Sequence, residues 1–347
     1  MSFLLPADFP KGFSDEKALE EFMTLPSQAL VDDLQKLAGD IMILGVGGKM
    51  GPTLARLAKR AAPQKRVVGV ARFSNPQVRA DLEAAGVETI ACDLLEREAV
   101  GDLPKIPNIV FMAGRKFGTT GNQALTWAMN THVPAIVAEV FREARIVGFS
   151  TACVYPYVSV LHQGATERTP ALPPPGEYAN SCLGRERMLE HFSLKHGTPG
   201  RLIRLSYAID MRYGVLHDVA RKVLAGEAID LTVGHANVIW QGDANAQALR
   251  SLLHCTTPTA PLNVSGPEVM SIRATATEFG RLLGREPVLS GIEGEQAWLV
   301  HTGMATGLFG YPLVPAAAMI AWTADWVAND RGSLSLDTHY EVHDGNF

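Results

Sequence analysis

The chain has 347 residues, of which 47% are hydrophobic and 19% are charged, and its formal net charge is −5 at pH 7. This length supports one large or two smaller domains with a substantial core, and the mild, dispersed charge argues against a nucleic-acid or membrane-surface partner. The hydrophobic runs are too short to cross a membrane, and the first residues lack the pattern of a secretory signal. Four cysteines without CxxC spacing predict free thiols in the cytosol and no metal site.

Two short helices are expected ahead of the first strand. Ser14 and the charged residues after it resemble a helix cap, which predicts a helix over 18–23, and apolar spacing predicts another over 28–37. We assign residues 1–38 to an N-terminal helical extension that packs on the domain edge. The alternative is an arm that contacts a second subunit.

The most informative segment is an apolar strand, Ile41–Leu44, followed by a glycine-rich turn and a helical pattern over 52–59. Glycine permits the tight turn and lets a phosphate approach the backbone without a Cβ in the way. The amides at the start of the helix can then hold a diphosphate. We therefore predict that this turn binds a dinucleotide through Gly45, Gly48, Lys49, Met50 and Gly51.

Strands and helices alternate from there to residue 205. Strands are predicted at 67–70, 88–91, 108–112, 145–149 and 201–205, a loop at 113–121, and helices at 77–85, 122–144 and 178–196. Such alternation implies parallel pairing, with ligands at the carboxyl ends of the strands. The predicted fold class is α/β, with a doubly wound, mostly parallel sheet in a Rossmann domain over residues 39–205.

The remaining residues, 206–347, are predicted to form mainly a smaller C-terminal substrate lobe, with some segments returning to the Rossmann core. Helical patterns occur at 212–225, 243–254, 274–283 and 315–329, separated by short apolar segments. A substrate is expected between the two parts.

The end of the second strand predicts which nicotinamide cofactor is bound. Sites that prefer NAD usually carry an acidic residue there, which holds the ribose 2′-hydroxyl, whereas this chain has Ala71 and then Arg72. A guanidinium suits a 2′-phosphate. We expect NADP as the cofactor and keep NAD as the alternative.

These motifs resemble the extended short-chain dehydrogenase/reductases, the group of NAD-dependent epimerases and dehydratases typified by UDP-galactose epimerase. The resemblance runs from about residue 40 to 290. It implies cofactor contacts, besides the glycine turn, at Asp93, Leu94, Ala113, Gly114, Lys116 and Asn130.

The resemblance also implies the catalytic pair. The segment 150–155 is similar to the family element that carries the catalytic hydroxyl, here Thr151, and Tyr178-Ala179-Asn180-Ser181 matches the start of the motif YxxxK. The lysine of that motif is replaced by Cys182. Its ammonium normally lowers the pKa of the tyrosine, and an unperturbed phenol titrates near 10.

Three interpretations of this substitution stay open. Another cation, Lys116 or Arg185, replaces the lysine; or Tyr178 serves only as an acid, which favours carbonyl reduction; or the protein binds the dinucleotide without redox turnover, as a sensor or assembly partner. Cys182 itself is expected to be a small buried side chain rather than a reactive thiol.

The resemblance implies an NAD(P)-dependent oxidoreductase or epimerase that acts on a hydroxyl/keto centre of a sugar, sugar acid or similar polyol. It also implies a homodimer formed by the helices at 122–144 and 178–196. Apolar residues such as Leu125, Met129 and Val137 face either that interface or the interior of the monomer.

Overall fold

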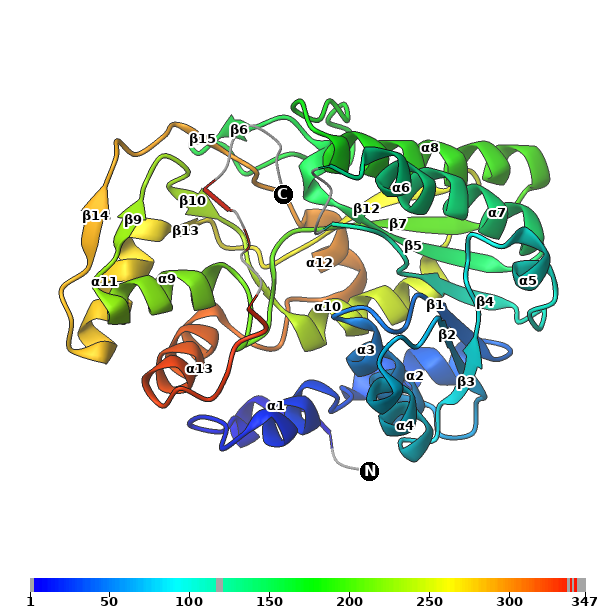
Figure 1. Ribbon diagram of the computed structural model, residues 1–347, viewed down its shortest axis with the longest axis horizontal. Helices are drawn as coiled ribbons and strands as arrows, with labels where there is room; N and C mark the ends of the chain where they lie inside the picture. The colour runs from blue at the N-terminus through cyan, green and yellow to red at the C-terminus, as the bar shows by residue number, and fades with distance from the viewer. Residues whose placement is uncertain (1–2, 117–120, 336–337, 339, 342–347) are drawn as a thin grey trace.

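The computed structural model describes residues 3–116, 121–335, 338, 340 and 341, so parts of the predicted loop at 113–121 and of the predicted second lobe lie outside the described residues. The central element is a seven-stranded parallel sheet with the strand order β12-β7-β5-β4-β1-β2-β3 (Figure 1). Its strands, in chain order, are β1 Ile41–Leu44, β2 Val67–Ala71, β3 Glu88–Ala91, β4 Asn108–Phe111, β5 Arg145–Thr151, β7 Gly200–Leu205 and β12 Ala260–Val264.

Helices cover both faces of the sheet, which confirms the doubly wound α/β prediction. One face carries α2 Gln28–Lys36, α3 Gly51–Ala61, α4 Pro76–Ala84, α10 Gln241–Arg250 and α12 Gly303–Phe309. The other carries α5 Arg97–Gly101, α6 Gln123–Trp127, α7 Val133–Val140 and α8 Glu177–His196. Strands β1, β2, β4 and β5 are almost entirely buried, as expected for a parallel sheet covered on both sides, whereas the edge strand β3 is partly exposed.

The helix predicted at 122–144 is divided into α6, a π-helical turn η2 (Ala128–His132) and α7. The cause is Pro134, which has no N–H to donate to the carbonyl four residues earlier, that of Asn130. The side chain of Arg185 on α8 reaches this carbonyl, with Nε 3.4 Å from the oxygen.

A second core lies beside the sheet. It is built on three mutually packed helices, α9 Val215–Ala225, α11 Ile272–Leu283 and α13 Ala316–Ala328. Four two-stranded ladders accompany them: β8 Ala208–Ile209 with β11 Ile239–Trp240, β9 Ala228–Asp230 with β14 Val288–Ser290, β10 His235–Ala236 with β13 Met270–Ser271, and β6 Val158–Ser159 with β15 Gln296–Ala297. Short helical turns occur at η1 Pro6–Asp8, η3 Ala152–Val154 and η4 Ser251–His254.

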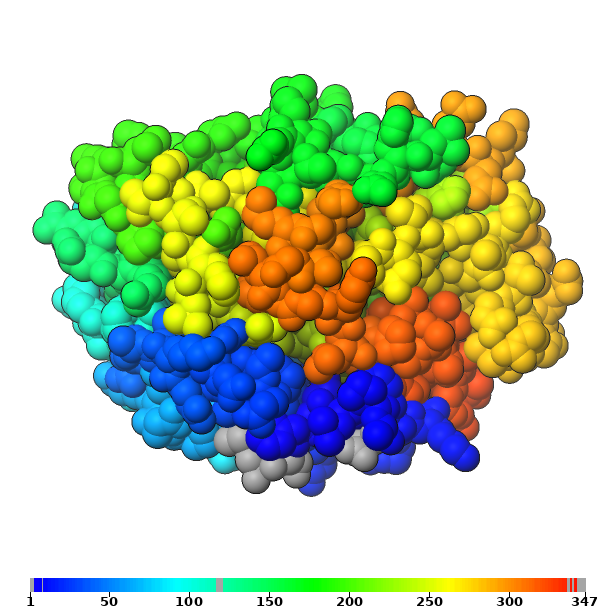
Figure 2. Space-filling view, turned by 180° about the vertical axis from the view of Figure 1, so that it is seen from behind, coloured from blue at the N-terminus to red at the C-terminus, as the bar shows by residue number. Residues whose placement is uncertain are grey.

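The N-terminal extension joins both cores. Helix α1 (Glu16–Met23) is capped by Asp15 rather than by Ser14, because the Asp15 carboxylate accepts from the amide of Ala18. Phe22 of α1 packs edge-on against Trp322 of α13 with the ring centroids 5.3 Å apart, whereas α2 contributes to the core under the sheet. Figure 2 shows the blue N-terminal segment lying against orange-red residues near the C-terminal end of the chain.

None of the helices in the described residues combines the length and apolarity that spanning a bilayer requires.

A buried ion pair lies between the sheet and α8. The guanidinium of Arg204 on β7 donates to both carboxylate oxygens of Glu186, at 3.0 and 2.6 Å, and the hydroxyl of Ser150 donates to the same carboxylate. The two charged side chains are only 6% and 2% exposed. The pair therefore fixes α8, which carries Tyr178, against β7 and against β5, which ends at Thr151.

We expect Glu186→Gln to lower the free energy of unfolding by about 3–5 kcal/mol, because it leaves the Arg204 guanidinium buried without its counter-charge. The control is Glu190→Gln on the same helix, which breaks an exposed pair with Arg187 and should cost less than about 1 kcal/mol. Urea unfolding measures both variants, and equal losses would contradict a structural role for the buried pair.

Candidate functional site

Two cavities lie at the carboxyl ends of the parallel strands, as the α/β topology predicts. The first, of about 370 Å³, lies on the side of the second core, and the second, of about 350 Å³, lies over β2 and β3. Both are lined by Gly45, Gly48, Met112 and Gly114, so they form one groove that crosses the glycine turn.

Glycine is required for different physical reasons at the three glycine positions of the turn. A Cβ on Gly45, whose φ is +90°, would lie 2.5 Å from the Ala113 amide nitrogen, and one on Gly51 would lie 2.2 Å from the Val46 carbonyl oxygen. A Cβ on Gly48 would instead point into the groove, with the Gly45 carbonyl oxygen as its nearest neighbour at 3.6 Å. Gly45 and Gly51 therefore serve packing, whereas Gly48 keeps the groove open.

Helix α3 begins directly after this turn, with Met50 at its N-cap position. Methionine has no side-chain oxygen to cap the helix, the Gly51 amide donates to the Gly48 carbonyl at 3.2 Å, and Pro52 has no N–H. An anion in the groove would therefore depend mainly on amides of the turn itself, such as those of Lys49 and Met50. Lys49, Met50 and Gly51 line the first cavity.

The second cavity contains the residues predicted to hold the adenosine half of a dinucleotide. Arg72, Asp93, Leu94 and Ala113 all line it, together with Ser74. The side chain of Arg72 is 66% exposed, and its Nη1 lies 4.0 Å from a carboxylate oxygen of Asp93.

The predicted catalytic residues Thr151 and Tyr178 both line the first cavity. Thr151 is the last residue of β5, and Tyr178 lies in the first turn of α8. Burial raises the pKa of the Tyr178 phenol well above 10, and the thiols of Cys182 and Cys153 act in the same direction, whereas Arg185 and a hydrogen bond with Thr151 lower it. At neutral pH Tyr178 is therefore a protonated phenol that can donate.

Cys182 occupies the position of the missing lysine and is 1% exposed. Burial raises the pKa of its thiol to about 11, which opposes formation of a reactive thiolate. Arg185, one helical turn further along α8, is a cation that lowers the pKa of Tyr178, and Lys116 lowers the pKa of the Cys153 thiol.

Arg185 lines the first cavity, and all three nitrogens of its guanidinium donate hydrogen bonds to the protein. Nη1 donates to the Phe149 carbonyl at 2.6 Å, Nη2 to the side-chain oxygen of Asn130 at 2.8 Å, and Nε to the main-chain oxygen of Asn130 at 3.4 Å. These acceptors are neutral, so they satisfy the hydrogen bonds without cancelling the positive charge. A Cβ on Gly114 would lie 2.3 Å from Arg185 Nη2, which makes glycine necessary there.

Asn130 is the one predicted cofactor residue that lines neither cavity. It is fully buried, and its side chain accepts from the amide of Arg115, donates to the Arg115 carbonyl and donates to Ser181. Its place in the structure is behind the cavity wall, where it fixes the loop after β4.

The remaining predicted residue, Lys116, lines the first cavity close to Lys49 and a tyrosine that sequence reasoning did not single out. Lys116 Nζ donates to the hydroxyl of Tyr213 at 3.1 Å, and Lys49 Nζ lies 4.3 Å from the centre of the same ring.

Sequence reasoning assigned no site role to several other lining residues, among them Ser206, Tyr207, Trp298 and Thr338. The last two lie beyond residue 290, where the resemblance ends. Tyr207 has a φ of +33°, an uncommon backbone conformation for a side chain of this size, which often marks functional sites. The sequence offers no local signal for Trp298 or Thr338.

We expect Gly48→Ala to leave the fold intact and to weaken dinucleotide binding at least tenfold, because the new methyl group enters the groove where a phosphate would approach the backbone. Gly51→Ala is the matched variant, and it should lower the unfolding temperature by several degrees, since its Cβ would overlap the Val46 carbonyl. Thermal unfolding together with calorimetric titration of NADP and NAD separates the two effects, and unaltered nucleotide affinity in Gly48→Ala would contradict the assigned site.

Comparisons with known proteins agree with this geometry. Similar solved structures include UDP-glucuronic acid 4-epimerase from Bacillus cereus in complex with NAD (16% identity, TM-score 0.70, covering 84% of this chain and 99% of the other). They also include UDP-glucose 4-epimerases from Thermotoga maritima with UDP-glucose (15%, TM-score 0.68, 84% and 99%) and from Thermus thermophilus with NAD (17%, TM-score 0.67, 83% and 98%). At such identities the likeness shows a shared fold.

A search of curated protein sequences finds no match. The profile of the NAD dependent epimerase/dehydratase family matches residues 41–256, from β1 through the end of η4. Since this match covers more than half of the chain, the protein belongs to the NAD dependent epimerase/dehydratase family.

Proposed function

We propose that the protein is an NADP-dependent oxidoreductase or epimerase that acts on a hydroxyl/keto centre of a carbohydrate-like substrate. The observation that carries this proposal is the position of Thr151 and Tyr178 in one cavity wall, beside the Arg185 cation and continuous with the glycine turn. The similar solved structures contain NAD, UDP-glucose or UDP-glucuronic acid, which supports a nicotinamide cofactor and a sugar-like substrate.

The groove fits a dinucleotide. The space in front of Gly48 is open, Lys49 and Met50 of the same turn line the groove beside it, and the adenosine cavity extends from there past Asp93. Arg72 and Ser74 lie where the ribose 2′ position would be recognised, and a guanidinium there favours a 2′-phosphate over a hydroxyl. This supports NADP as the preferred cofactor.

The protonated state of Tyr178 favours the direction of carbonyl reduction. A bound nicotinamide supplies the hydride to the carbonyl carbon or accepts it from the alcohol. Tyr178 gives its proton to the carbonyl oxygen, Thr151 donates a hydrogen bond to the same oxygen, and the Arg185 charge stabilises the phenolate that remains. The reverse reaction needs that phenolate at the start, and burial makes it scarce at neutral pH.

The homodimer remains part of the proposal. Val137 is fully buried in the monomer core and so is unavailable to an interface. The same helical layer exposes 39% of Trp127 on α6 and 65% of Leu194 on α8, and such apolar side chains can be covered by a second copy.

We also propose a cytosolic location, because all four cysteines are free. Thiols kept reduced are typical of that compartment.

Turnover distinguishes the candidate reactions. The purified protein is incubated with a panel of keto sugars and aldoses, in one series with NADPH or NADH and in a second with NADP+ or NAD+, and the absorbance of the reduced nicotinamide and the sugar composition are followed. Stoichiometric loss of absorbance identifies a reductase, and substrate interconversion without net loss identifies an epimerase. Cofactor binding with neither outcome would overturn the enzymatic proposal and leave the nucleotide-binding alternative.

We expect Arg185→Met to lower kcat/KM by about 100-fold, because the charge that stabilises the Tyr178 phenolate is lost. The ascending limb of the pH–rate profile for alcohol oxidation, which reports formation of the phenolate, should also move to higher pH, a shift that a merely structural defect would not produce. Arg187→Met, two positions away and exposed on α8, is the matched control and should retain activity. A pH–rate profile of Arg185→Met that lies at the same pH as that of the unaltered protein would show that another group replaces the missing lysine.

We expect Arg72→Ala to weaken NADP binding by roughly 10- to 100-fold and NAD binding less than about twofold, because only NADP offers a phosphate to the guanidinium. Arg79→Ala on α4, whose side chain pairs with Glu83, is the control. Calorimetric titrations of both nucleotides measure the difference, and equal losses would mean that Arg72 does not contact the 2′-phosphate.

A further inference from the structure

The described walls of the first cavity carry charge of one sign. They include Lys49, Arg115, Lys116 and Arg185, and the described lining residues contain no aspartate or glutamate. Cations that share a poorly solvated cavity raise its affinity for an anion, since water screens them less there than at the surface. Whatever enters this cavity therefore meets a positive field.

Two of these cations converge on a single ring. Lys49 Nζ lies 4.3 Å from the centre of the Tyr213 ring, and Lys116 Nζ lies 3.1 Å from the Tyr213 hydroxyl and 5.8 Å from its ring centre. The two ammonium groups come from different loops, one after β1 and one after β4. Together with the phenol hydroxyl they form a cluster of donors on one side of the cavity.

This cluster faces the second core rather than the adenosine cavity. Tyr213 belongs to the turn between β8 and α9, and neither lysine lines the second cavity. A dinucleotide's diphosphate is expected at the backbone of the glycine turn, whose amides can bind it without the lysine side chains. Lys49 can thus offer its amide to the cofactor and its ammonium group to the substrate.

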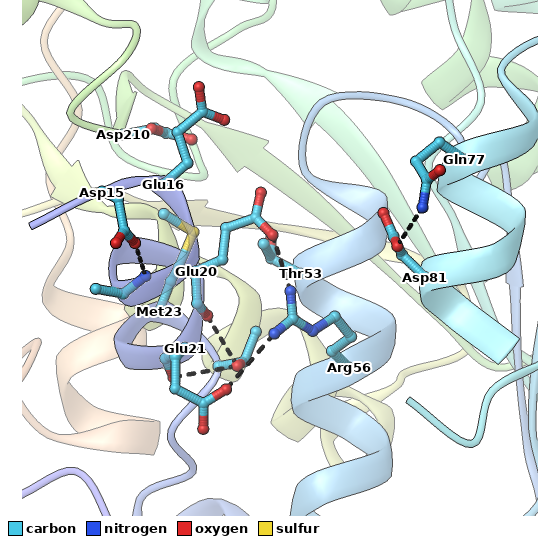
Figure 3. A network of polar contacts seen from close by, with 12 residues as sticks. Asp15, Glu16, Glu20, Glu21, Met23, Thr53, Arg56, Gln77, Asp81 and Asp210 are labelled. Carbon is cyan, nitrogen blue, oxygen red and sulfur yellow. Dashed lines mark hydrogen bonds and ion pairs between the residues drawn. The ribbon is translucent and has the colours of Figure 1, made fainter. Parts of the chain in front are cut away.

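The turn that carries Tyr213 is rigidly held. Asp210 and Tyr213 exchange two main-chain hydrogen bonds, at 3.1 and 2.8 Å, and the Asp210 carboxylate receives both arms of the Arg212 guanidinium, at 3.0 and 2.9 Å. Arg212 also contacts Glu16 and Glu20 of α1. Figure 3 shows Glu16 of α1 beside Asp210, and Glu20 reaching Arg56 of α3.

Lys49 lies among charges of both signs in the described part of the chain. Burial lowers the pKa of its ammonium group to about 8, Asp210 acts in the opposite direction, and Arg212 and Lys116 lower it further. A carboxylate bound beside Lys49 would act in the same direction as Asp210 and favour the charged ammonium group.

We propose that the substrate of this protein is a polyhydroxy acid, whose carboxylate binds to Lys49, Lys116 and Tyr213. This rests on the proposed function, because the reacting hydroxyl or carbonyl of the same molecule must reach Thr151 and Tyr178 in the same cavity. The acid group is the handle that positions the sugar chain. Lys49 and Lys116 act as specificity-determining residues.

Calorimetric titration of the NADP-loaded protein tests this with matched pairs: D-glucuronate and D-glucose, D-galacturonate and D-galactose, D-gluconate and D-glucitol. D-glucose 6-phosphate is added as a second kind of anion. We expect at least one acid to bind about tenfold or more tightly than its neutral counterpart, as expected for charge-assisted hydrogen bonds.

In Lys49→Met the preference for the acid should fall about tenfold or more, while NADP affinity should change less than about twofold. Lys49→Arg should retain most of the preference for the acid. Lys36→Met, which removes an exposed lysine of α2, is the control for net charge. Lys116→Met should likewise lower the preference for the acid about tenfold or more.

Four results would overturn the proposal. They are equal binding of acids and neutral partners, binding of the phosphate ester alone, no binding of any probe, and a loss of NADP affinity in Lys49→Met with acid preference intact. Turnover of neutral keto sugars without acid preference would overturn the acid site while leaving the proposed oxidoreductase or epimerase activity standing.

Discussion

The guanidinium of Arg185, held by three neutral oxygens, is the interaction on which the candidate site depends. It joins α8, which carries Tyr178, to β5 and to the π-helical turn η2. A buried guanidinium loses much of its hydration, and the oxygens of Phe149 and Asn130 replace that hydration without neutralising the charge. The cavity therefore keeps a fixed cation beside its phenol, although the family lysine is replaced by Cys182.

Much of the groove could be predicted because parallel strands place their carboxyl ends on one edge of the sheet. That rule places the glycine turn with Gly45 at this edge, whereas Asp93, Thr151 and Tyr178 were implied by the resemblance to the family. The grip on Arg185 was not predictable in the same way. It requires Pro134 to release the Asn130 carbonyl, and the expected single helix at 122–144 concealed this break. Tyr213, Trp298 and Thr338 reach the cavity through tertiary packing alone, for which the sequence has no local pattern.

One motif serves two purposes in the glycine turn. Gly45 and Gly51 are constrained by neighbouring backbone atoms of the protein itself, and only Gly48 faces open space. The three glycines cannot be told apart from the sequence, because the closeness of Gly45 to Ala113 and of Gly51 to Val46 is a property of the folded chain. The distinction separates residues needed for folding from one needed for binding. It also explains how the same turn can adjoin both cavities.

The carboxylate of Glu20 contacts two arginines. One is Arg56 of α3, the helix that follows the glycine turn, and the other is Arg212 of the turn that carries Tyr213. Any hinge motion that widens the groove by separating these two arginines must break at least one of the contacts. Glu20 is 33% exposed, so mobile counter-ions compete for it. Rates of ligand entry and release should consequently rise with ionic strength, even for an uncharged ligand.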